Sequence, residues 1–282
     1  MDLLATLARQ VLIADGAMGT ELLAAGAPAD ACLEEFCVSQ PELVRGVHER
    51  YLAAGARLIC TNTFGANAVR LARLGLEHRV NELNWVAAQL ARDTAKDAGA
   101  FVAGVAGPTG LSEAAMNEQG VDLEAVFAEQ LGALLDGGAR VIILATFTNL
   151  RELEAAILAK HALHHCPVVA CVVCSEDARL PDGLPLDEAF ARLKAADADV
   201  VGVNCTGVSP ALLRALEAWN GDLPLAVFPS AGLPENGRHP ITPEQFARDG
   251  LALAGVNVRL IGGCCGAGPA HIAALAAAFA ER

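Results

Sequence analysis

Aromatic residues are scarce in this sequence, at 4% of its 282 residues, and basic residues are outnumbered by acidic ones. The 20 lysines and arginines against 33 aspartates and glutamates give a formal charge of −13. This acidity argues against binding to a nucleic-acid backbone, which needs clustered basic side chains. The apolar runs are interrupted well before the roughly 18 residues that cross a bilayer, for example at Arg259 and Pro269. We therefore expect neither a nucleic-acid nor a membrane partner.

The N-terminus has no basic segment ahead of its first apolar stretch and carries Asp2 instead, so it does not predict a secretory signal. The nine cysteines are an odd number, in a chain whose size does not require disulfides. We therefore expect a cytoplasmic protein in a reducing compartment, whose thiols are free or bind a metal. The apolar content of 54% excludes a largely disordered chain.

What the sequence does contain is a regular alternation of short apolar runs with longer helical patterns. The runs are apolar almost throughout, as is typical of parallel strands buried on both faces, and each gap is long enough for a crossover helix. The helical patterns are clearest at residues 41–54, 122–135, 210–219 and 269–280. The predicted strands are residues 11–14, 57–61, 101–106, 140–144, 168–174, 200–204, 225–228 and 258–261.

Eight such units, with no linker or break in composition, predict an α/β fold of one domain over residues 1–282, a single (β/α)8 TIM barrel. A doubly wound open sheet is the main competitor. Its G-x-G-x-x-G fingerprint is missing, because the turn after the first strand reads DGAMGT at residues 15–20. Residues 64–101 hold two helical patterns, so we expect one elaborated loop there.

The strongest chemical signal is a set of three cysteines. Cys205 follows the sixth predicted strand and Cys264 and Cys265 follow the eighth, so a barrel brings them to the rim where active sites form. Three protein ligands with an open fourth position are typical of catalytic zinc. Three thiolates make zinc a poor generator of hydroxide but suit it to binding and deprotonating a substrate thiol, which points to alkyl transfer to sulfur.

Packing is the alternative interpretation of these cysteines, because cysteine is often a small buried hydrophobe. The flanking glycines in the sequence GGCCG favour the metal site, since they leave no core to fill and let both sulfurs face one point. Cys171 and Cys174 match C-x-x-C, but positions i and i+3 of a strand face opposite sides, which favours packing over redox or zinc chemistry. The other cysteines and most histidines are expected to be packing or surface groups, including His48, His161, His164 and His165. His239, in a Gly-Arg-His-Pro loop, indicates no role.

Polar groups at other strand ends are candidates for binding the substrate. Asp15 ends the first strand, with simple turn chemistry as the alternative because Asp-Gly is a common turn. The amides that follow it, beginning at Gly16 and Ala17, can hold a carboxylate at the start of the next helix. Thr63 and Asn204 are further candidate contacts.

At these residues the sequence resembles the zinc-dependent homocysteine S-methyltransferase family, which includes betaine- and S-methylmethionine-dependent enzymes and the homocysteine module of cobalamin-dependent methionine synthase. The resemblance implies a (β/α)8 barrel with Zn²⁺ on Cys205, Cys264 and Cys265 and the homocysteine sulfur as exchangeable ligand. It also implies that the Asp15 loop holds the amino-acid end of homocysteine. The matching motifs are DGAMGTEL (15–22), TNTFGAN (61–67), GPTG (107–110), VGVNCTG (201–207), SAGLP (230–234) and GGCCG (262–266).

The sequence departs from this family at the end of the fourth strand, where Ala145 stands in place of a glutamate that helps to bind the substrate ammonium. Loss of such a charge-assisted hydrogen bond, about 1.5–3 kcal/mol, weakens binding tenfold or more. Ser230 also stands where the family often has asparagine.

The leading hypothesis is methyl transfer to homocysteine, forming methionine. The donor is S-methylmethionine or another small sulfonium, or a separate methylcorrinoid protein. The first alternative is a zinc-thiol binding or altered-substrate member with weakened homocysteine recognition. The second is a redox protein that uses Cys171 and Cys174.

Overall fold

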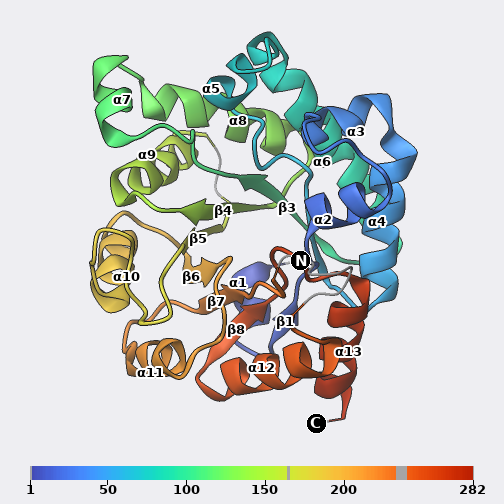
Figure 1. The fold of residues 1–282 in the computed structure, drawn as a ribbon, viewed down its shortest axis with the longest axis vertical. Coiled ribbons are helices and arrows are strands. Elements are labelled where there is room, and N and C mark those ends of the chain that lie inside the picture. The colour runs from blue at the N-terminus through green and yellow to red at the C-terminus, as the bar shows by residue number, and fades with distance from the viewer. Residues whose placement is uncertain (1, 164–165, 233–239, 282) are drawn as a thin grey trace.

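Figure 1 shows the computed structural model of the chain, which describes residues 2–163, 166–232 and 240–281. Eight strands surround a central axis, and the helices form a ring outside them. The strands are β1 (Leu12–Ile13), β2 (Leu58–Cys60), β3 (Phe101–Ala106), β4 (Val141–Phe147), β5 (Val168–Val172), β6 (Val200–Asn204), β7 (Leu225–Phe228) and β8 (Val258–Ile261).

All eight strands pair in parallel, in the order β1-β8-β7-β6-β5-β4-β3-β2. The two ends of this order also meet. Ala14 and Leu58 form a parallel bridge, the Asp15 amide donates to the Leu58 carbonyl at 2.9 Å, and the Arg57 amide donates to the Ile13 carbonyl at 2.8 Å. The predicted (β/α)8 barrel is therefore confirmed, and an open doubly wound sheet is excluded because β1 and β2 are not free edges.

The four clearest helical patterns correspond to α4, α8, α11 and α13. The elaborated segment after β2 holds α5 and α6, as the sequence predicts. The helices are α1 (Leu3–Leu7), α2 (Met18–Ala24), α3 (Phe36–Ser39), α4 (Pro41–Ala53), α5 (Ala68–Ala72), α6 (Val80–Ala95), α7 (Glu113–Glu118), α8 (Leu123–Gly137), α9 (Leu150–His161), α10 (Leu186–Ala195), α11 (Pro210–Ala218), α12 (Pro243–Gly255) and α13 (Pro269–Ala280), with short 3₁₀ turns η1 (Leu33–Glu35) and η2 (Glu77–Arg79). Among the described residues, no helix combines the length and the apolar character needed to span a bilayer.

Strand ends are where the structure differs most from expectation. β5 ends at Val172, so Cys174 lies beyond the strand. The chain turns there, and the Ser175 amide donates to the Arg179 carbonyl at 2.8 Å. β4 runs on to Phe147, and its register with β5 shifts between Leu144 and Phe147. The first difference comes from a local turn and the second from the pairing of β4 with β5, and hydrophobic pattern alone encodes neither.

The core has two layers, as alternation along buried strands requires. Inward-facing residues such as Val105 and Phe228 form a cluster inside the barrel, and outward-facing ones pack against the helices. Leu3 and Leu7 of α1 join the inner cluster and plug the barrel at the start of the strands. Burial of each of these leucines stabilises the plug by about 1.5–3 kcal/mol. The opposite end, at the carboxyl ends of the strands, carries the polar residues.

Candidate metal centre

Three cysteines converge at the carboxyl ends of β6 and β8. Cys205 directly follows β6, and Cys264 and Cys265 lie in the turn after β8. The Cys205 sulfur lies 2.7 Å from that of Cys264 and 3.3 Å from that of Cys265. All three sulfurs lie within 4.8 Å of one another, and over the described residues this is the one group of three or more His, Cys, Asp or Glu side chains so arranged. The predicted convergence is thus present in the fold.

Close backbone packing shapes the turn that carries Cys264. A Cβ on Gly263 would lie 2.5 Å from the Ala267 Cβ and 3.2 Å from the Gly16 Cα, so a side chain there has no room. The Gly263 amide donates to the Asp15 carbonyl at 2.8 Å, and the Cys264 amide donates to the Pro229 carbonyl at 2.8 Å. These bonds fix the turn between the ends of β1 and β7.

Cys205 adopts a left-handed backbone conformation, with φ at 56°. This conformation costs a residue with a side chain about 1–3 kcal/mol and persists only where the surroundings impose it. Here the Cys205 amide donates to the Phe228 carbonyl at 3.1 Å. The left-handed residue turns the chain out of β6 and leaves the Cys205 thiol facing the β8 turn.

The sulfur cluster has the chemistry of a thiophilic metal site. Every cysteine of the chain is a free thiol, and the sulfur separations exceed the roughly 2.05 Å of a disulfide. Hydrogen bonds from Cys205 and Cys264 lower the pKa of the Cys265 thiol, so this exposed group ionises first. Sulfur ligands favour soft metals, and a tetrahedral ion with metal–sulfur bonds of about 2.3 Å places its ligands about 3.8 Å apart. A small outward movement of the Cys205 and Cys264 sulfurs satisfies that geometry.

Asp15 lies beside this cluster as a nearly inaccessible carboxyl, 2% exposed. Its Oδ2 atom accepts a hydrogen bond from the Cys60 amide at 2.7 Å. Burial raises the pKa of Asp15 to about 7, and the bonds from Cys60 only partly oppose this shift. The burial of Asp15 and its contact with Cys60 were not predicted, because both depend on the β1–β2 closure.

The other predicted substrate contacts are held mainly by the protein itself. The Ala17 amide donates to the Ala267 carbonyl at 2.9 Å, and a Cβ on Gly16 would overlap that same carbonyl. Thr63 is fully buried, and its hydroxyl donates to the Val105 carbonyl at 2.7 Å. Asn204 is 4% exposed and lies within hydrogen-bonding distance of Cys264.

The remaining predicted groups lie away from the cluster. Cys171 is fully buried in β5 and Cys174 is buried beyond its end, which fits the packing interpretation. His161 ends α9 and pairs with Asp197 at 3.4 Å, while His48 is fully buried in α4. Outside the described residues lie His164, His165, His239 and the last two residues of the 230–234 motif.

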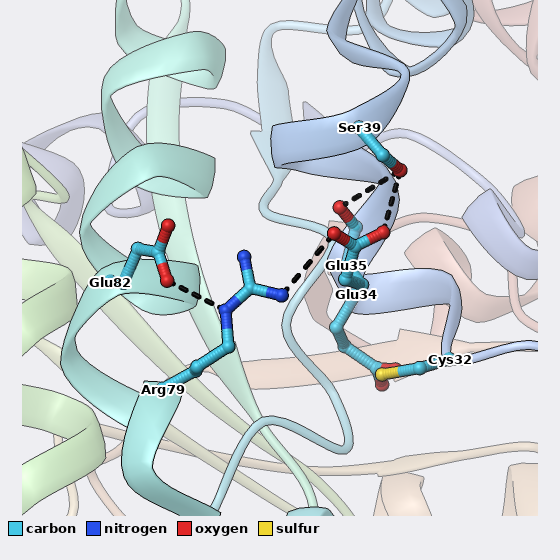
Figure 2. Close-up of polar contacts among 6 residues, drawn as sticks. All are labelled: Cys32, Glu34, Glu35, Ser39, Arg79 and Glu82. Atoms are coloured by element: carbon cyan, nitrogen blue, oxygen red, sulfur yellow. Dashed lines mark hydrogen bonds and ion pairs between the residues drawn. The ribbon is translucent and has the colours of Figure 1, made fainter. Parts of the chain in front are cut away.

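A second polar cluster, shown in Figure 2, joins η1 and α3 to η2 and α6. Arg79 binds Glu35 at 3.3 Å and Glu82 at 2.7 Å, and Glu34 accepts the Gly65 amide at 2.7 Å. The cluster therefore fastens the segment after α2 over the 61–67 loop, which is a structural role. The residues drawn are Cys32, Glu34, Glu35, Ser39, Arg79 and Glu82.

The sequence model of the homocysteine S-methyltransferase family matches residues 12–279 of the chain. The chain belongs to this family. It is therefore an enzyme of the methyltransferase class, and the resemblance seen in its sequence motifs is confirmed. In this family member the match takes in all eight strands and the three converging cysteines.

Curated relatives and solved structures agree with this assignment. The family member is 34% identical to the methionine synthase of Mycobacterium tuberculosis over 307 aligned residues, which cover 99% of the chain and 25% of that protein. It thus spans about a quarter of the length of that relative. The metallated form of the Escherichia coli homocysteine methyltransferase MmuM superposes with a TM-score of 0.80 at 31% identity, covering 97% of this chain and 98% of that one. The oxidised form of MmuM gives a TM-score of 0.81 at 32% identity.

Proposed function

We propose that the chain is a zinc-dependent thiol S-methyltransferase that forms methionine from homocysteine, with residues 1–282 acting as one methyltransferase domain. The observation that carries this proposal is the convergence of three cysteine sulfurs within 4.8 Å on the rim of a barrel of the homocysteine S-methyltransferase family. Cys205, Cys264 and Cys265 would hold the ion. When bound, Zn²⁺ supplies a Lewis acid that keeps a substrate thiol deprotonated near neutral pH.

The chain's own residues would bind and orient the substrate. We propose that Asp15 receives the homocysteine ammonium, because it is the buried carboxyl beside the cysteine turn. A cation brought against it favours the ionised carboxylate and lowers its pKa below the value near 7 of the free protein. Phe64 and Ala145 pack at the edge of the inner apolar cluster with Cys264, so this wall excludes water from the methyl acceptor.

Backbone groups of the Asp15 loop complete the proposed substrate site. The Gly16 position lets the loop lie against the cysteine turn, and the Ala17 amide ties it to Ala267. Amides beyond Ala17, at the start of α2, are the ones left to face a substrate carboxylate. Thr63 is bonded inward, so we assign it to support of the 61–67 loop and not to direct contact with homocysteine.

The methyl donor we propose is S-methylmethionine or another small sulfonium. A separate methylcorrinoid protein docking on the rim is the second candidate. Methionine formation with each donor, at equal homocysteine, separates the two. Failure of both donors with zinc-loaded protein would contradict the methyltransferase proposal.

Ala145 supports one alternative, an altered thiol substrate. Its methyl group lies against the inner cluster near the end of β4, where the family resemblance predicts a carboxylate. Binding of homocysteine compared with 4-mercaptobutanoate, which lacks the amino group, tests this alternative. Strong preference for homocysteine would exclude it, and equal affinity would support it.

Zinc content tests the metal site. Purified wild-type protein is expected to hold about one zinc per chain, and Cys264→Ala to lose most of it. Cys37→Ala is a matched control, because Cys37 is a buried thiol whose partner is the Asn62 carbonyl. Near-stoichiometric zinc in Cys264→Ala would contradict the three-thiolate site.

A further inference from the structure

Asn204 is the last residue of β6 and precedes Cys205. Its side chain connects two segments far apart in the sequence. The Asn204 Oδ1 accepts the Thr146 amide at 2.7 Å, and its Nδ2 donates to the Thr146 hydroxyl at 2.6 Å. The same Nδ2 donates to the Cys264 sulfur at 3.7 Å. One buried amide thus ties the bulged end of β4 to the sulfur cluster.

The orientation of this amide follows from its partners. A backbone N–H can only donate, so the group that receives the Thr146 amide has to be the Asn204 carbonyl oxygen. The NH₂ group then necessarily faces the Thr146 hydroxyl and Cys264. Both of its N–H bonds are engaged, one on oxygen and one on sulfur. The side chain therefore cannot rotate without losing all three contacts.

Thr146 is held in an unusual backbone conformation at this point. Its φ is 66°, in the left-handed region, and it lies where the β4–β5 register shifts. Cys205, adjacent to Asn204, is also left-handed, with φ at 56°. Strained residues therefore lie near the carboxyl ends of β4 and β6, which flank β5 on either side. Asn204 is bonded to Thr146 and adjacent to Cys205.

We propose that Asn204 is a positioning residue of the metal centre, whose N–H group fixes the direction of the Cys264 sulfur and whose bonds to Thr146 set the rim between β4 and β6. The inference rests on the proposed zinc function. A hydrogen bond to a metal-bound thiolate withdraws part of its negative charge and holds the ligand in one rotamer, and such outer contacts control metal affinity. Asn204 acts in this way through Cys264 and needs no contact with substrate.

Asn204→Asp is the sharpest test, because it keeps the shape and the acceptor for the Thr146 amide but replaces the N–H group on sulfur with an oxygen. The protein is titrated with Zn²⁺ against a competing chelator, and with Co²⁺ to record the thiolate-to-cobalt absorption. We expect zinc affinity to fall about 10–100-fold and the cobalt band to shift. Asn62→Asp is the matched control, since Asn62 is a buried rim asparagine bonded to the Leu33 carbonyl, and it should retain wild-type affinity.

Wild-type affinity and an unchanged cobalt band in a folded Asn204→Asp variant would overturn the inference. If that variant does not fold, Thr146→Ala decides, because it removes the hydroxyl that anchors the Asn204 amide, together with the γ-methyl group, and keeps the backbone amide that Asn204 accepts. A weaker zinc affinity is expected there, and unchanged affinity and absorption would overturn the inference. A wild-type protein that binds no zinc would instead overturn the proposed function, and this inference with it.

Discussion

The Asp15 carboxylate receives the Cys60 backbone amide at 2.7 Å inside a site that leaves it 2% exposed. The hydrogen bond crosses the β1–β2 seam that closes the barrel. Asp15 thus lies both at the barrel closure and beside the turn that carries Cys264 and Cys265. The Gly263 amide of that turn donates a hydrogen bond to the Asp15 backbone carbonyl at 2.8 Å. Changes at Asp15 are therefore expected to affect folding stability and substrate binding in separable ways.

Homocysteine affinity should depend on pH through Asp15. Its pKa in the free protein is about 7, so the carboxylate that would pair with an ammonium is lost as pH falls below that value. We expect the homocysteine Kd to rise by up to tenfold per pH unit below about 7. Asp15→Asn should bind more weakly at pH 8 and lose this component, keeping only the pH dependence that comes from deprotonation of the substrate thiol on zinc. The same pH dependence of the homocysteine Kd in wild type and in Asp15→Asn between pH 5 and 8 would contradict the assigned role.

The same substitution should stabilise the fold at neutral pH. The raised pKa means that the unfolded chain ionises Asp15 more readily than the folded protein does. Asp15 therefore lowers the free energy of unfolding, by nothing below about pH 4 and by an amount that grows as pH rises toward 7. Asp15→Asn removes this penalty, on the order of 1–4 kcal/mol at pH 8. Urea unfolding at pH 4 and pH 8 measures it. A variant less stable than wild type at pH 8 would show that the carboxylate contributes net stability.

Ala145→Glu should strengthen homocysteine binding. The resemblance to the family implies a glutamate at this position, and a charge-assisted hydrogen bond to the substrate ammonium is worth about 1.5–3 kcal/mol. We expect the homocysteine KM to fall about tenfold or more while 4-mercaptobutanoate gains nothing. Ala145→Gln is the uncharged control. Equal gains in affinity for both thiols would show that the added carboxylate does not bind the substrate ammonium.

His48 should destabilise the fold in mild acid. It is fully buried in α4, neither ring nitrogen has a partner, and burial lowers its pKa to about 4 from 6.5. His48 therefore takes up a proton in the unfolded chain at a pH where it stays neutral in the folded protein. Stability is lost as pH falls from 6.5 toward 4. His48→Leu should gain about 2 kcal/mol relative to wild type on going from pH 8 to pH 5. A pH-independent difference would contradict this account of His48.

Gly16 should tolerate no side chain. A Cβ there would overlap the Ala267 carbonyl and lie 2.9 Å from the Tyr51 ring, so Gly16→Ala has to displace the cysteine turn. We expect a loss of about 1–3 kcal/mol in unfolding free energy together with weaker zinc binding. Gly207→Ala is the control, because its Cβ would meet nothing within 4 Å on the same rim. Wild-type zinc affinity in Gly16→Ala would show that the position of the Asp15 loop does not influence the metal site.

The eight strands could be predicted because they are buried on both faces, and such strands appear in a sequence as short apolar runs. The meeting of Cys205 with the 264–265 pair could be predicted as well, because topology places the carboxyl ends of parallel strands on one rim. The hydrogen bonds that connect Thr146, Asn204 and Cys264 could not be predicted. They depend on a left-handed Thr146 and a register shift in β4, neither of which leaves a signal in residue type. The sequence wrongly predicts that the Ala17 amide faces a substrate carboxylate, for a related reason. The amide bonds to the Ala267 carbonyl, and Ala267 lies far away in the sequence.

In the proposed metal centre, three cysteine thiolates hold zinc with one position open for the substrate sulfur. X-ray absorption at the zinc edge counts those sulfurs directly, on the zinc-loaded protein with and without homocysteine. We expect about three sulfur ligands at about 2.3 Å in the free protein and about four once homocysteine is added. An unchanged sulfur count on saturation with homocysteine, or fewer than three sulfurs in the free protein, would contradict the proposed metal centre.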